Sequence, residues 1–175
     1  MTNKHDIHTV EQLKQLFPYQ FSDPDATYDL YQGWIPIVVG LCMELDALLG
    51  DQQDQFHWKM MKEKFGSARL YYVLGGQNIV IVDMHELTGP QSYRVLPIEP
   101  TALFEQVDAL VEAAENATEN ICMVCGAAAQ TRSYNGYLQT LCDAHHPDVI
   151  GQDAVRTLAK ARSPGLPRTP RGDAS

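Results

Sequence analysis

Three cysteines and a histidine near the end of this 175-residue chain constrain its fold more than any other feature. Cys122 and Cys125 form a Cys-x2-Cys pair followed by Gly126, and sixteen residues later Cys142 and His145 repeat the spacing of two. A tight turn can point both sulfurs of such a pair at one ion, and glycine readily adopts the backbone conformation that this turn needs. The four side chains are therefore candidate ligands of one metal ion.

The connector between the two pairs predicts how they meet. The segments QTRSY and YLQTL flank Asn135-Gly136, which is the strongest two-residue signal for a β-hairpin with a type I′ turn. Such a hairpin returns the chain to its start and brings Cys142 beside Cys125. Three thiolates and one imidazole suit tetrahedral Zn²⁺, and a complete set of protein ligands favours a structural over a catalytic ion. The alternative is that the four side chains only pack together.

Two histidines compete for the fourth ligand position. We prefer His145, because Cys-x2-His mirrors the first pair and because Pro147 restrains the backbone of His146. Clustered cysteines in a reducing cytosol are more often metal ligands than disulfides. Cys42 stands apart in an apolar stretch and is interpreted as a buried thiol.

The remaining sequence predicts an α+β fold with a small antiparallel sheet and packed helices, followed by a zinc-ribbon or treble-clef-like module. The periodicity predicts helices over 33–50 and 101–119, and a short final helix over 147–162. A hairpin is expected over 55–74, bent around Phe65-Gly66-Ser67, with further strands at NIVIVDMH and SYRVLPI. We expect three regions: 1–119 as the α+β domain, 120–162 as the zinc-binding module, and 163–175 as a disordered basic tail.

The helix over 101–119 carries two stripes. Its apolar stripe consists of Leu103, Val107, Leu110, Val111 and Ala114. A second stripe, about 120° away around the helix, consists of five acids: Glu105, Asp108, Glu112, Glu115 and Glu119. No lysine or arginine within the helix pairs with them, so the stripe either faces water or binds a basic partner.

The charge of the chain limits its partners. The formal net charge is −9, and the last sixteen residues are basic, so the preceding part carries −12. A field of this sign repels phosphate backbones and suits a basic protein surface. The start MTNKHDIHTV shows no secretory signal, and no apolar run is long enough to cross a bilayer. We therefore expect a cytoplasmic protein without membrane contact.

Three segments, KEKFGSARLYY, AENATENICMVCG and TLCDAHH, resemble an uncharacterised family of bacterial proteins carried by phages and other mobile elements. Its members have a KEKFG segment before an aromatic strand, then a helix that ends at Cys-x2-Cys-Gly, then Thr-Leu-Cys-x2-His. The resemblance covers roughly residues 33–146, and residues 78–100 resemble an insertion. It implies the zinc site and a mobile-element context, and it supplies no reaction.

These observations favour a non-enzymatic zinc-binding protein that acts through protein–protein interaction, as a phage or mobile-element modulator of host defence. One alternative is a nucleic-acid-binding zinc finger, although Arg132 is the single lysine or arginine between Cys122 and His146. A second alternative is a degenerate HNH-like nuclease, although residues 126–141 contain no histidine or acid to serve as the base. The cations Lys59, Lys62, Lys64 and Arg69 are interpreted as a solvated hairpin tip.

Overall fold

A computed structural model of the chain describes residues 7–151 and shows an α+β fold. The α-helices are α1 (Val10–Leu16), α2 (Ile35–Leu49), α3 (Ala102–Thr118) and α4 (Pro147–Ile150), and the 3₁₀ helices are η2 (Gln32–Trp34), η3 (Gly50–Gln55) and η4 (Asp143–His145). The strands are β1 (Thr27–Tyr28), β2 (Phe56–Lys64), β3 (Ser67–Leu74), β4 (Gln77–Asn78), β5 (Val80–Glu86), β6 (Gly89–Val95), β7 (Gln130–Tyr134) and β8 (Tyr137–Leu141).

The main sheet is built around the hairpin of β2 and β3. Its strand order is β1-β2-β3-β4, and the turn between β2 and β3 places Phe65 and Gly66 at positive φ, which confirms the predicted bend. The expectation of a purely antiparallel sheet is wrong, because β1 pairs with β2 in parallel. This strand has only two residues, and pairing over more than thirty residues leaves no local pattern in the sequence.

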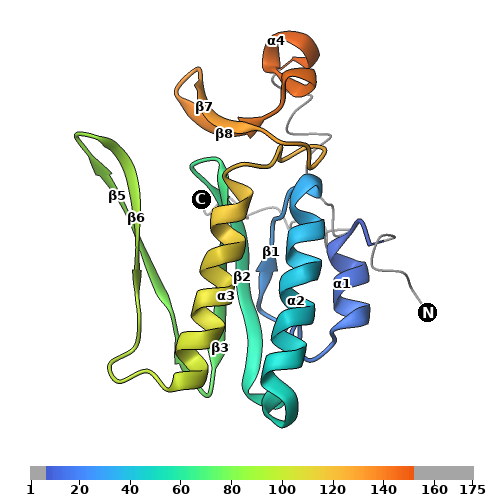
Figure 1. The fold of residues 1–175 in the computed structure, drawn as a ribbon, viewed down its shortest axis with the longest axis vertical. Coiled ribbons are helices and arrows are strands. Elements are labelled where there is room, and N and C mark those ends of the chain that lie inside the picture. Colours follow the sequence, from blue (N-terminus) through green and yellow to red (C-terminus); the bar gives the residue numbers. More distant parts are fainter. Residues whose placement is uncertain (1–6, 152–175) are drawn as a thin grey trace, which may run out of the picture.

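Helices α2 and α3 lie side by side over one face of this sheet, and α1 flanks α2 (Figure 1). Pro36 stands in the first turn of α2 and Gly50 ends it at a φ of 50°, as the sequence predicts. The core between helices and sheet is aromatic, with stacked or edge-on contacts among Phe56, Trp58, Tyr72 and Phe104. The segment Gln32–Gln55 has the length and composition of a membrane span, but a buried core helix such as α2 meets the same criteria.

Strands β5 and β6 form a separate two-stranded antiparallel sheet that stands beside α3 (Figure 1). Both strands are predicted by the sequence, but they do not extend the main sheet. The hairpin of β7 and β8 forms a third small sheet beyond the end of α3, next to α4. Its turn residues Asn135 and Gly136 have φ values of 52° and 85°, as the predicted type I′ turn requires.

Two predicted segments lie partly or wholly beyond the described residues. The final helix predicted over 147–162 is interrupted early, because α4 ends at Ile150 and Gly151 adopts a φ of 79°; the predicted positions Ala154 and Leu158 lie outside the described range. The predicted basic tail over 163–175 lies wholly outside it.

Candidate metal centre and acidic face

The four predicted ligands converge on one point. The donor atoms of Cys122, Cys125, Cys142 and His145 all lie within 4.8 Å of one another. The Nδ1 atom of His145 is 3.7 Å from the sulfur of Cys122 and 3.3 Å from that of Cys142, and the sulfurs of Cys125 and Cys142 are 3.7 Å apart. A tetrahedral zinc site would separate two sulfurs by about 3.8 Å, and a sulfur from a nitrogen by about 3.6 Å. The cluster therefore has the dimensions of a metal site.

Two local structures position these ligands. In the first, Gly126 at a φ of 77° donates its N–H to the carbonyl of Cys122 at 2.8 Å, which closes the turn around the Cys-x2-Cys pair. In the second, β8 leads directly to Cys142, and the helical turn η4 follows. The N–H of His145 donates to the carbonyl of Cys142 at 3.0 Å, which brings the two residues together. Both structures follow from residues that the sequence identifies.

The geometry selects between the two candidate histidines. His146 is not part of the cluster, and its ring packs edge-on against Tyr134, with ring centres 5.1 Å apart. Its Nδ1 accepts a hydrogen bond from the N–H of Asp148 at 3.2 Å, which caps the start of α4. His145 therefore completes the ligand set, as we preferred from spacing.

The thiols of the cluster differ in how readily they lose a proton. Burial alone would raise the pKa of the Cys122 thiol, but backbone N–H groups of Cys142, Cys125 and Val124 lower it below its usual value. Burial and the adjacent sulfurs raise the pKa of Cys125 to about 11. Neighbouring thiolates repel one another, so a bound cation is what would hold all three sulfurs deprotonated.

The cluster is attached to the start of α2. The N–H of Gly33 donates to the carbonyl of Met123 at 2.9 Å, and the indole N–H of Trp34 donates to the carbonyl of Ile121 at 3.3 Å. Cys122 and Met123 are themselves fully buried in the main core. The metal-binding turn is therefore packed against the α+β body.

Gly33 offers a test of this close packing. A Cβ at Gly33 would overlap the carbonyl oxygen of Cys122 and lie 2.7 Å from the backbone nitrogen of Gly126. Gly33→Ala should therefore destabilise the protein by about 2–3 kcal/mol, because backbone atoms on both sides have to move. Urea unfolding measures this loss. Gly40→Ala is the control, since no atom lies within 4 Å of its added Cβ, and this change within α2 should stabilise the protein slightly. Equal stability of the two variants would contradict the packing argument.

The predicted acidic stripe on α3 is not one open surface. Glu105, Glu112 and Glu119 are exposed, whereas Asp108 and Glu115 are buried. Both buried acids form ion pairs with Arg94, which reaches them from β6. The expectation that all five acids face water or a partner is therefore wrong for Asp108 and Glu115. Their cation comes from a strand 14 and 21 positions away, which helical spacing does not reveal.

The buried acids also bind the main sheet. The hydroxyl of Tyr72 donates to Asp108 at 3.1 Å, and the backbone N–H of Leu70 donates to Glu115 at 2.6 Å. Burial raises the pKa of Glu115 despite the opposing effect of Arg94. Arg94 and its two acids therefore fasten the β5–β6 hairpin to α3 and β3.

The cations of the predicted hairpin tip also differ from one another in their surroundings. Lys62 and Lys64 lie over the rings of Tyr71 and Phe65, with the nitrogen 5.0 and 4.7 Å from the ring centres. Arg69 is instead buried, and it donates to the hydroxyls of Ser67 and Ser92. Arg69 is therefore a second link between β3 and the β5–β6 hairpin.

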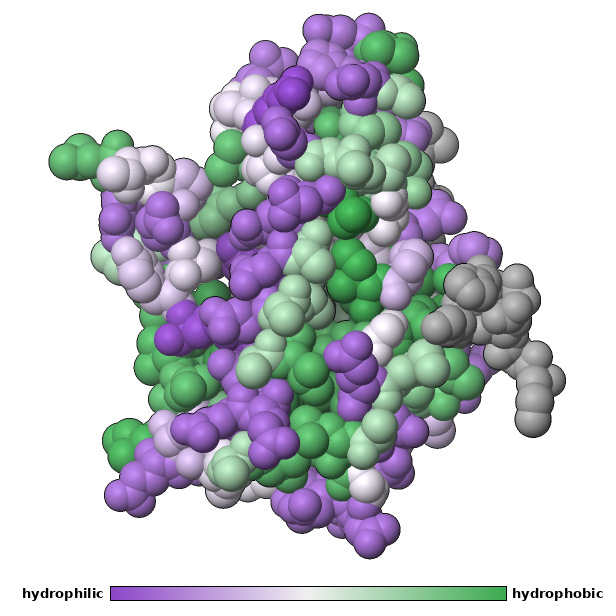
Figure 2. All heavy atoms as spheres, viewed as in Figure 1, coloured by the Kyte–Doolittle hydropathy of each residue, from purple (hydrophilic) through white to green (hydrophobic). Residues whose placement is uncertain are grey.

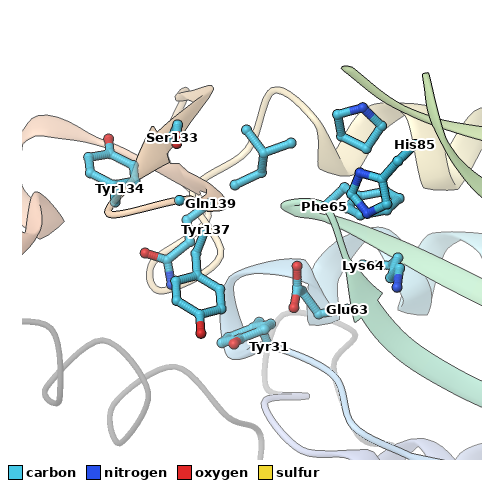
Figure 3. A pocket seen from close by; sticks show the side chains of 12 residues that line it. Tyr31, Glu63, Lys64, Phe65, His85, Ser133, Tyr134, Tyr137 and Gln139 are labelled. Atoms are coloured by element: carbon cyan, nitrogen blue, oxygen red, sulfur yellow. The ribbon is translucent and has the colours of Figure 1, made fainter. Parts of the chain in front are cut away.

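A cleft of about 610 Å³ lies where the β2–β3 turn, the β5–β6 hairpin and the β7–β8 hairpin meet. The sequence did not indicate it. Figure 3 shows Phe65 and His85 together on one side of it and Tyr31 and Tyr137 on another, with Glu63 between them. Its lining comes from separate segments of the chain, so no local motif marks it. The cleft combines aromatic walls with the side chains of Glu63, Lys64 and His85.

Comparison with known proteins found no relative of this chain. No family model, no curated protein and no solved structure matches this chain. The functional assignment therefore depends on the chemistry of the ligand cluster and of the surface.

Proposed function

We propose that this chain is a non-enzymatic zinc-binding protein that acts by binding another protein. The observation that carries the proposal is the cluster of Cys122, Cys125, Cys142 and His145, whose donor atoms lie within 4.8 Å of one another and could hold one ion. An ion held by four protein ligands has no open position for water or substrate, so it serves structure. Three sulfurs and one imidazole favour Zn²⁺ over harder cations.

The arrangement of the ligands supports a treble-clef-like module. The first pair lies in a tight turn, and the second pair follows a β-hairpin and enters the helical turn of η4. A bound zinc ion would tie this turn to the hairpin and hold both against α2. The metal would then fix the end of the molecule without taking part in a reaction.

The partner that fits this protein is a basic one. Before its last sixteen residues the chain carries a charge of −12, and three acids of α3 remain exposed: Glu105, Glu112 and Glu119. The resemblance to proteins of phages and mobile elements supports a partner in host defence. Electrostatic attraction of this kind speeds association and favours partners of opposite charge.

A tagged pull-down from the native host, with mass spectrometry, tests the proposal. We expect the wild-type chain to capture a basic protein and the double variant Glu105→Lys/Glu112→Lys to capture less of it, through a slower, salt-sensitive association. The matched control is Asp51→Lys/Asp54→Lys, which changes the charge equally at exposed positions of η3. Capture of no basic protein by the wild-type chain would contradict the proposal, and equal loss in both variants would leave α3 without a specific role.

A further inference from the structure

Exposed large apolar side chains are concentrated on the β5–β6 hairpin and the residues that follow it. Among the described residues twelve large apolar side chains are exposed, and eight of them lie between positions 80 and 98. Figure 2 shows apolar side chains along the edge of the molecule where this hairpin stands, including its tip. A contiguous patch of this kind marks a binding surface more often than chance exposure does.

The strand register gathers five of these side chains on one face. Val80 pairs with Val95 and Val82 pairs with Tyr93, and Met84 follows on the same face. Each of the five is between 41% and 53% exposed. We call this set, Val80, Val82, Met84, Tyr93 and Val95, the outer face.

The opposite face of the hairpin carries polar side chains that form ion pairs and hydrogen bonds with the rest of the protein. Arg94 pairs with the buried acids of α3, and Ser92 accepts from Arg69 and donates to Asp83 at 2.7 Å. A shift of one residue would exchange the two faces, and these contacts prevent it. Several polar side chains of the hairpin thus face the protein while five apolar ones face outward, which is unusual for a surface strand.

The charge around the outer face argues against a second copy of this chain as its occupant. Between residues 77 and 130 the chain has eight acids and one lysine or arginine, Arg94, which is already paired. Two such surfaces would repel each other. The outer face offers on the order of 400 Å², about half of what each partner contributes to a stable dimer.

The neighbouring surface supplies the rest of a site for a basic partner. On the α3 side of the hairpin, Ser92, Tyr93 and Arg94 line a cleft of about 490 Å³ together with Glu112 and Glu119. Among the described residues, neither edge of the β5–β6 sheet pairs with a further strand, so backbone groups are open to an added one. Apolar contacts, carboxylates and an open strand edge therefore lie together.

We infer that the outer face, together with Glu112 and Glu119 on the α3 side of the hairpin, binds an extended basic segment of a partner protein in which apolar and cationic residues alternate. Alternate side chains of such a segment point to opposite sides, so its apolar residues contact Val82 and Tyr93 while its cations reach the acids. This inference rests on the proposed function and specifies the surface that performs it.

The experiment uses the full chain and a labelled peptide of alternating valine and lysine, followed by fluorescence anisotropy. The double variant Val82→Ser/Tyr93→Ser should bind at least tenfold more weakly than the wild type. The control Leu16→Ser/Met43→Ser removes two apolar side chains of similar exposure, 43% each, from other elements and should bind within about twofold of the wild type. A second peptide with glutamate in place of lysine should not bind. All four substituted positions are exposed, so the variants should keep the fold, which circular dichroism verifies.

Two results would overturn this inference. One is a hairpin variant that binds the valine–lysine peptide as tightly as the wild type does. The other is a wild-type dimer in sedimentation velocity that the hairpin variant abolishes, which would make a second copy the occupant. If the hairpin variant still captures the basic protein found in the pull-down, the inference fails while the proposed function stands. If the wild-type chain captures no basic protein but the peptide results hold, the proposed function fails while the inferred binding surface stands.

Discussion

Cys142→Ser should release the metal and loosen residues 120–150, while the sheet and α2 stay folded. Cys142 joins the β7–β8 hairpin to the helical turn that carries His145, so its loss opens both halves of the site. Zinc contributes about 10–16 kcal/mol of apparent binding energy to small zinc-finger peptides, and most of that energy is folding energy. We expect loss of the ion and fast hydrogen exchange throughout the module.

Matched variants separate this effect from general damage. His145→Ala should behave like Cys142→Ser, whereas His146→Ala should retain the ion, because the ring of His146 packs against Tyr134 instead. Cys42→Ala removes a fully buried thiol distant from the site, and it should cost stability without releasing metal. Metal content by elemental analysis and exchange by mass spectrometry measure both effects. A Cys142→Ser protein that retains one ion would contradict the ligand assignment.

Arg94→Met should destabilise the protein by about 3–5 kcal/mol, although no residue of the metal site changes. The substitution leaves Asp108 and Glu115 buried without their cation, and an uncompensated buried charge is costly. The triple variant Arg94→Met/Asp108→Asn/Glu115→Gln should recover part of the loss, because both amides still offer an oxygen to Tyr72 and to the N–H of Leu70. Urea unfolding compares the three proteins.

The pH dependence gives a second signature of this ion cluster. Burial already raises the pKa of Glu115 in the folded protein, and removal of Arg94 should raise it further. A carboxyl whose folded pKa lies above its unfolded pKa binds protons more tightly when folded, so acidification stabilises the fold at that residue. The destabilisation of Arg94→Met should therefore shrink between about pH 7 and about pH 5. A loss of stability that stays constant over this range would mean that packing, and not charge, holds the hairpin.

The Cys3His cluster could be predicted from sequence because its determinants are local. The paired spacings, Gly126 and the Asn135-Gly136 turn each act within a few residues, and together they place four ligands without reference to the rest of the fold. The helices and the β2–β3 hairpin follow from periodicity and a glycine turn in the same way.

The remaining features depend on contacts between distant segments. The parallel pairing of β1 with β2 joins Thr27 to Met60, and a strand of two residues has no periodicity. The burial of Asp108 and Glu115 depends on Arg94, which lies on a strand outside the main sheet. Helical spacing correctly grouped the five acids but could not show which of them the hairpin would cover.

The metal content of protein purified without added zinc tests the central claim most directly. The account predicts close to one equivalent of zinc per chain by elemental analysis, and a marked fall in thermal stability when a strong chelator removes it. A preparation free of metal whose thermal unfolding is unchanged by chelator or by added zinc would contradict a structural metal centre.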